Sequence, residues 1–369
     1  MSSGDLILVI VVGTAIVFDF TNGFHDTANV VATSISTRAI GPRRAVAMAS
    51  LLNFAGAFIS LKVATTIGKG FVESGAVTTT VVFAALVGAI GWNLITWFYG
   101  LPSSSSHALI GGLVGAVIAA QGWSAVNGKG LLDKLIVPAV VAPLIAFLVA
   151  GSSILIVYRM VGRLRPCAVG RGFRLGQIVT SGLLALSHGT NDAQKTMGVI
   201  TLALIANGNI PATGFNVPDW VVVVSASAIA VGTFTGGWRI IKTVGTRIIS
   251  MDPAQGFAAQ TAGSVVILAA SSVGYPLSTT HVISGGVTGA GAAKSVSAVR
   301  WGVAGDIVRA WVLTLPASAA LAALVYGITR LFGGGAAGPV VVAVALLIGG
   351  GAMFARRAVP RVAPPVTQE

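Results

Sequence analysis

Apolar runs of about 20 residues recur along the whole chain, and they constrain its fold more than any other feature. A helix rises about 1.5 Å per residue, so about 20 apolar residues cross the hydrocarbon core of a bilayer. Only 9% of the 369 residues are charged, whereas soluble domains carry roughly 25%. The sequence therefore predicts an all-α polytopic membrane protein. A soluble α/β protein with buried strands would not need runs so long or so numerous.

The apolar runs predict about 11–12 transmembrane segments. The first and sixth runs are each followed by a second apolar piece, at 26–37 and 192–207, and we interpret each pair as one broken crossing. The runs at 102–121 and 276–293 are short and rich in glycine, so re-entrant hairpins are the alternative to full crossings there. The predicted crossings are 5–23, 45–66, 77–99, 105–121, 133–158, 175–190, 220–237, 256–273, 279–293, 303–328 and 338–355.

The net charge of +13 comes from short basic clusters between apolar runs. This pattern sets membrane orientation and does not indicate nucleic-acid binding. With eleven crossings every cluster falls on one face, which predicts a multi-pass plasma-membrane protein with its N-terminus outside. One cysteine, Cys167, excludes an intramolecular disulfide and a cysteine metal site. The clusters are Arg38, Arg43 and Arg44; Arg159, Arg163, Arg165, Arg171 and Arg174; Arg239, Lys242 and Arg247; Lys294 and Arg300; Arg356, Arg357 and Arg361.

Three blocks of sequence occur twice, in the same order. "LPSSSSHALIGGLVGA" from Leu101 matches "YPLSTTHVISGGVTGA" from Tyr275, and "FTNGFHDTANVVA" from Phe20 matches "LSHGTNDAQKTMG" from Leu186. "FAGAFISLK" and "FTGGWRIIK" align loosely. Five crossings separate the copies, so the second is inverted, as in many secondary transporters. We predict repeats at 1–158 and 175–328, a basic cytoplasmic linker at 159–174, and a final helix and tail at 329–369.

Asp26 and Asp192 occupy matching places inside the two repeats. A carboxylate at membrane depth costs about 3 kcal/mol on insertion scales and is normally functional. Gly23 and Gly189 precede them and permit a break that would expose backbone groups to an ion. Capping of a helix N-terminus is the alternative interpretation. Amide side chains that suit a hard cation lie beside the carboxylates: Asn22, Asn29 and Asn191.

A run of hydroxyl side chains follows a proline in both repeats. Proline ends the preceding helix, and a helix N-terminus with free amides attracts anions. Two such termini would form a cradle for a tetrahedral oxyanion, although hydroxyls and glycines also serve helix packing. The residues predicted to bind this oxyanion are Ser103, Ser104, Ser105, Ser106, Ser278, Thr279 and Thr280.

His107 and His281 follow these runs. They are candidates for proton carriage, for substrate contact or for a structural role. His25, His188 and Gln194 are further candidates for proton or substrate contacts. Ser187, His188 and Asp192 are the three residue types of a hydrolase triad, but the sequence around them has no nucleophile elbow. We therefore expect no enzyme activity and no cofactor.

These paired motifs resemble the signatures of the inorganic phosphate transporter family of the Pit type. The resemblance covers nearly the whole chain and implies a symporter that carries phosphate on a cation gradient. It maps the family's ion and phosphate motifs to Gly23, His25 and Asp26, to Gly189, Asn191 and Asp192, and to the hydroxyl runs. Two positions depart from the family pattern. His25 stands where the family usually has Asn, and Lys195 stands where the first repeat has Asn29.

Lys195 makes the resemblance closest to bacterial members that use protons and carry phosphate or its neutral complex with a divalent metal. A fixed ammonium beside Asp192 would occupy the space of a sodium ion. We therefore expect a proton-coupled phosphate symporter, with Asn22, Asp26, Asn29, Asn191, Asp192 and Lys195 in cation coupling. The alternatives are sodium coupling, with Asp26 and Asp192 as metal ligands, and a sulfate permease on the same scaffold. A channel is an alternative from another class, and a homodimer is compatible with the sequence.

Overall fold

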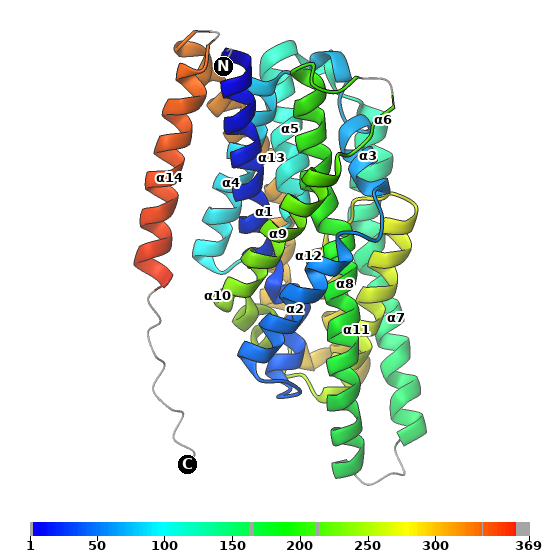
Figure 1. Cartoon of the computed structure of the whole chain (residues 1–369). Coiled ribbons are helices and arrows are strands. Elements are labelled where there is room, and N and C mark those ends of the chain that lie inside the picture. Colours follow the sequence, from blue (N-terminus) through cyan, green and yellow to red (C-terminus); the bar gives the residue numbers. More distant parts are fainter. Residues whose placement is uncertain (1–2, 162–165, 212–213, 334, 359–369) are drawn as a thin grey trace.

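The structure is a computed structural model that describes residues 3–161, 166–211, 214–333 and 335–358, and most helices run along the long axis of one bundle (Figure 1). Among these residues no strand forms beyond an isolated bridge between Val72 and Val126, so the predicted all-α class is confirmed. The first half contains α1 (Ser3–Ser36), α2 (Pro42–Gly56), α3 (Lys62–Lys69), α4 (Thr79–Tyr99), α5 (Ser105–Gln121), α6 (Gly128–Leu131) and α7 (Val137–Val161). The second half contains α8 (Pro166–Ala206), α9 (Asp219–Thr235), α10 (Trp238–Lys242), α11 (Pro253–Ser272), α12 (Thr279–Lys294), α13 (Trp301–Leu331) and α14 (Ala337–Ala358).

The order of helices repeats: α8 to α12 match α1 to α5, and α13 matches α6 and α7 together. In Figure 1, α1 enters the bundle at the end marked N, whereas α8 begins at the opposite end, beside the end of α7. The two matching helices therefore run in opposite directions, which an inverted repeat requires. Most of the basic segment 159–174 is helical, because α7 continues to Val161 and α8 starts at Pro166.

The predicted break beside Gly23 and Gly189 is wrong, because α1 and α8 pass through both positions as continuous helices. These glycines instead allow close helix packing. A Cβ on Gly23 would lie 2.4 Å from the backbone oxygen of Ile229 in α9, and one on Gly189 would lie 2.1 Å from that of Asn53 in α2. These positions require a residue without a side chain, and the helix does not change direction there.

The breaks fall instead in the third repeated block. α2 ends at Gly56 before α3 begins at Lys62, and the helical segments Asp219–Thr235 and Trp238–Arg247 are bent by 61° at the break between them. At this place the halves meet through matching residues. Ser50 Oγ donates to Ala230 O at 2.7 Å, and Asn53 Nδ2 donates to Thr233 Oγ1 at 2.8 Å. In both pairs the two partners are 180 residues apart. This is the offset between the two copies of the third block, so each residue bonds to its own equivalent in the other half. The axis that relates the repeats therefore passes between α2 and α9.

The two halves interlock, because α5 packs on α13 and α12 packs on α7. The repeated glycines make this possible. A Cβ on Gly115 would lie 2.1 Å from Ala319 O, and one on the matching Gly289 would lie 2.1 Å from Phe147 O. The repeats therefore form one bundle and not two separate bodies.

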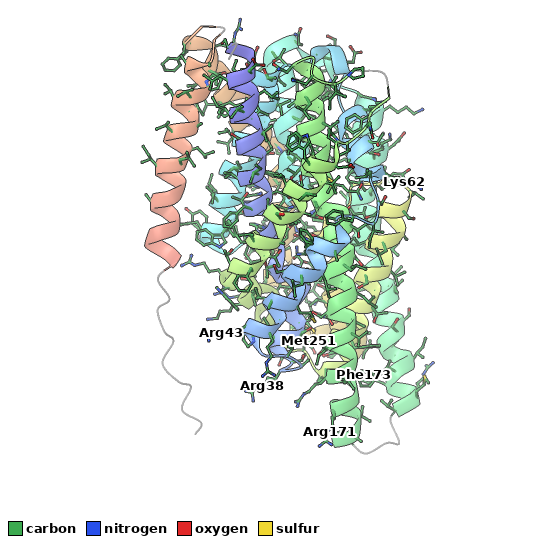
Figure 2. The ribbon with its side chains drawn as sticks, viewed as in Figure 1. Arg38, Arg43, Lys62, Arg171, Phe173 and Met251 are labelled. Atoms are coloured by element: carbon green, nitrogen blue, oxygen red, sulfur yellow. The ribbon has the colours of Figure 1, made fainter. Side chains whose placement is uncertain are left out.

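Four described helices are long and apolar enough to cross a membrane by length and composition alone, or five if α9 and α10 count as one bent crossing. The other predicted crossings correspond to helices that are short or carry buried polar groups, such as α8, whose polar side chains face the bundle interior. Arg38, Arg43 and Arg171 lie towards the same end of the bundle (Figure 2), as the predicted orientation requires. Arg163, Arg165 and Arg361 lie outside the described residues.

Candidate functional site

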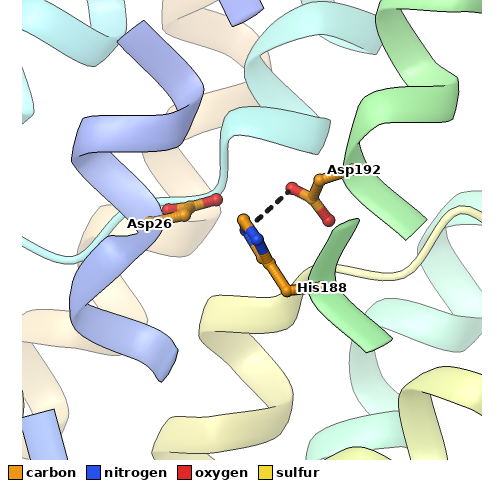
Figure 3. Close-up of side chains that lie close together, drawn as sticks. All are labelled: Asp26, His188 and Asp192. Carbon is orange, nitrogen blue, oxygen red and sulfur yellow. Dashed lines mark ion pairs between the residues drawn. The ribbon is translucent and has the colours of Figure 1, made fainter. Parts of the chain in front are cut away.

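The two carboxylate motifs meet inside the bundle, where α1 packs against α8. Asn22 Nδ2 of α1 donates to Asp192 Oδ2 of α8 at 3.4 Å. Asp26, His188 and Asp192 each offer a ligand atom, and these atoms lie within 4.8 Å of one another (Figure 3). No predicted site residue is more than 5% exposed, so the polar cluster is closed to solvent in this conformation.

Lys195 lies at the centre of the cluster and is fully buried. Its Nζ donates to Asp192 Oδ1 at 2.8 Å, to the backbone oxygen of Leu277 at 3.1 Å and to Ser106 Oγ. A buried ammonium needs such a partner, because an unpaired charge in an apolar medium is costly. The lysine therefore joins the second carboxylate to the hydroxyl segment of the first repeat.

Asn29 makes the matching contact in the other direction. Its Nδ2 donates to Thr280 Oγ1 at 2.8 Å and lies 3.4 Å from Thr279 Oγ1. Thr280 is the repeat equivalent of Ser106, as Lys195 is of Asn29. Each half thus sends one donor to the hydroxyl segment of the other half, and only the donor from the second half is charged.

His25 and Asn191 are also equivalent, and both orient a carboxylate. His25 Nδ1 lies 2.9 Å from Asp26 Oδ1, while Asn191 Nδ2 donates to Asp192 Oδ1 at 2.8 Å. The other ring nitrogen of His25 lies 3.2 Å from Thr96 Oγ1 and 3.4 Å from Ser103 Oγ. His25 therefore positions Asp26 in the way that Asn191 positions Asp192.

Some residues of the two hydroxyl segments cap helices, and others contact the polar cluster. Ser104 Oγ accepts from His107 N at 3.2 Å and Ser278 Oγ accepts from His281 N at 3.3 Å, so these two predicted phosphate ligands cap α5 and α12. Ser105 Oγ is buried and has no hydrogen-bond partner among the described residues. The two helix starts lie together. The remaining members, Ser103, Ser106, Thr279 and Thr280, bond to the side chains described above.

His107 and His281 contact each other and not the carboxylate cluster. Their rings form an edge-to-face pair with centroids 4.6 Å apart, and His281 stacks on Trp311 at 4.0 Å. Both line an apolar cavity of about 810 Å³ beside Pro143 and Leu144. In this conformation the pair packs the two repeats together.

Gln194 and Ser187 also bond away from the cluster. Gln194 Oε1 accepts from Val63 N at 2.8 Å and Ala64 N at 3.2 Å, so it caps the free start of α3 at the break after α2. Ser187 Oγ donates to Leu183 O at 2.7 Å, which leaves it without the contact to His188 that a hydrolase triad needs.

Several polar residues of this region were not singled out from the sequence. Asn53 Oδ1 lies 3.1 Å from His188 Nδ1, and Asn53 in turn donates to Thr233. Both lie directly beside the third repeated block, which could have pointed to them. Thr96 and Asp19 were also missed. Asp19 is a carboxylate inside the first apolar run, which is a signal of the kind that identified Asp26.

The chain is similar to known proteins over most of its length. A model of the phosphate transporter family matches residues 22–170 and again residues 164–322, once for each half. A "Probable low-affinity inorganic phosphate transporter" of Mycobacterium tuberculosis is 52% identical over 89% of this chain and 79% of its own length. A protein of the same description from Bacillus subtilis is 45% identical over 88% of this chain and 98% of its own length.

A solved structure, "The sodium-dependent phosphate transporter", superposes with a TM-score of 0.78. It is 28% identical and covers 88% of this chain and 99% of that chain. The repeat, the fold and the sequence relatives lead to one conclusion: the chain belongs to the phosphate transporter family.

Proposed function

We propose that this protein imports inorganic phosphate together with protons by alternating access. The observation that carries the proposal is the contact of Lys195 with both Asp192 and Ser106. It places a fixed positive charge between a buried carboxylate and the hydroxyl segment that would hold phosphate oxygens. A neutral complex of phosphate with a divalent metal is a second form of the same substrate.

Charge balance supports coupling to cations. HPO4²⁻ beside Asp26 and Asp192 brings four negative charges together, and Lys195 cancels one. The starts of α5 and α12 each offset about half a charge. The remaining negative charge has to be compensated by cations that travel with phosphate, because buried uncompensated charge is strongly unfavourable.

The Lys195 contact also supports protons over sodium. Its Nζ lies 2.8 Å from Asp192 Oδ1, where a sodium ion that used this carboxylate oxygen would have to bind. The solved relative is described as sodium-dependent. In this chain the lysine supplies a permanent cation at one of the two carboxylates.

Phosphate uptake by purified protein in liposomes tests the transported substrate. We expect saturable uptake of labelled phosphate that unlabelled phosphate inhibits and sulfate does not. Inhibition by sulfate as strong as that by phosphate would indicate a sulfate permease. Uptake that does not saturate and never exceeds the external concentration would indicate a channel. Either result would overturn the proposal.

A further inference from the structure

Asp19 is a buried carboxylate that the proposed mechanism has not used. It lies on α1 two turns before Asp26, is 0% exposed, and neither oxygen has a hydrogen-bond partner among the described residues. Asp26 and Asp192, in contrast, both accept hydrogen bonds. Burial of an ionised, unbonded carboxylate is strongly unfavourable, so Asp19 requires an explanation.

The neighbours of Asp19 supply too few donors for an ionised carboxylate. Asn22 and Thr196 face it, and Asn22 Oδ1 and Thr196 Oγ1 also have no partner in the described part of the chain. One N–H of the Asn22 amide points to Asp192, and the amide oxygen can only accept. The second N–H of Asn22 and the Thr196 hydroxyl are then two donors for three acceptor atoms, the two Asp19 oxygens and Asn22 Oδ1. One added proton on Asp19 would supply a third donor, and Asn22 Oδ1 can accept its hydrogen bond.

The charged groups that act on Asp19 belong to α8. They are the carboxylate of Asp192 and the ammonium of Lys195. Asp19 has no equivalent in the second repeat, where Ala185 occupies the matching position. Among the residues that the structure describes, three carboxylates and one ammonium are buried, and the carboxylate without a hydrogen-bond partner belongs to the first repeat alone.

We infer that Asp19 binds the coupling proton, and that Asn22 connects its protonation to Asp192. This inference rests on the proposed proton symport and names the residue that performs the coupling. A protonated Asp19 removes one negative charge beside the substrate site, which favours phosphate binding from outside. Loss of that proton towards the cytoplasm restores the charge and favours phosphate release.

The test compares two transport modes of Asp19→Asn in liposomes. Asn mimics a permanently protonated Asp, so we expect exchange of internal for external labelled phosphate to continue. Concentrative uptake should be lost. One coupled proton supports about a hundred-fold accumulation for a gradient of about two pH units, and in the variant this ratio should fall to about one. Asp133→Asn, at an exposed carboxylate, is the matched control and should behave as wild type.

Each outcome is decisive for the inference. Asp19→Asn that still concentrates phosphate overturns it, as does an inserted variant that loses exchange together with accumulation. If Asp19→Asn does not insert, Asp19→Glu keeps a proton site of higher intrinsic pKa. Its uptake should then fall off at higher pH than in wild type, and an unchanged pH profile would overturn the inference. Wild-type protein that neither exchanges nor accumulates phosphate would instead contradict the proposed function.

Discussion

At the residue scale, the two halves of the site differ most at one pair of positions. Asn29 and Lys195 donate to equivalent hydroxyls, Thr280 and Ser106. A neutral donor leaves Asp26 without a permanent counter-charge, whereas the lysine pairs with Asp192 at 2.8 Å. The asymmetry gives the cluster one internal cation, and this residue is where we expect ion preference to be set.

The variant Lys195→Asn should therefore be destabilised in the absence of sodium and partly restored by it. Removing one partner of a buried ion pair costs about 3–5 kcal/mol, and a bound sodium ion could replace the lost charge. Thermal unfolding of detergent-solubilised protein in sodium chloride and in choline chloride measures this effect. The control Lys129→Asn changes an exposed lysine and should unfold as wild type. Equal unfolding temperatures of Lys195→Asn and wild type in choline would contradict the assigned role.

At the element scale, glycine has two functions that the sequence does not separate. Inside α1 and α8 it permits close approach of α9 and α2, and both helices remain continuous. At Gly236, with φ of 73°, it permits the chain to turn between α9 and α10. Both uses follow from the absent side chain, so the motif alone could not show which one applied.

We expect Gly189→Ala to destabilise the protein and Gly13→Ala to leave it unchanged. The added Cβ at position 189 would lie 2.1 Å from Asn53 O, while nothing lies within 4 Å at position 13. Overpacking of this kind costs about 1–3 kcal/mol, whereas Ala at an open helix position is neutral or slightly stabilising. Thermal unfolding of both variants measures the difference. Equal stability of the two would contradict the packing role of Gly189.

The sequence predicted the positions of the helices well and the contacts between them less well. The apolar runs depend on bilayer thickness, which each segment satisfies alone, so the predicted crossings coincide with helices. Their ends agree less well, because α1 and α8 continue through the predicted breaks and the run 45–66 is divided between α2 and α3. The repeat identified the two matching carboxylate motifs, which meet at Asn22 and Asp192. The capping of α3 by Gln194 and the contact of Asn53 with His188 did not, because each depends on a partner more than 130 residues away.

At the scale of the whole molecule, the interlocked halves enclose the polar cluster and place basic residues towards one end. Arg38 and Arg43 mark this end in Figure 2, and α6 lies near the other in Figure 1. Cytoplasmic loops carry the excess of basic residues. We therefore expect the end with the arginines to face the cytoplasm and the end with the N-terminus to face outward.

Labelling of single cysteines tests this orientation, since Cys167 is the one native cysteine. In a Cys167→Ser background we expect a membrane-impermeant maleimide to label Lys129→Cys on intact cells. Arg44→Cys should react only after the cells are made permeable. Both positions are exposed, but Arg44 follows Arg43 at one end of the bundle, whereas Lys129 belongs to α6 near the other. The reverse pattern would show that the orientation is inverted.

The most direct test of the account is accumulation of phosphate against its gradient in sodium-free proteoliposomes under an imposed pH gradient. We predict that wild-type protein concentrates labelled phosphate when the exterior is acidic, and that dissipating the gradient releases it. Asp192→Asn removes the partner of Lys195, so it should be less stable than wild type, still insert into the membrane, and lose this accumulation. An absolute requirement for sodium in wild-type uptake, or full accumulation by Asp192→Asn, would contradict the account.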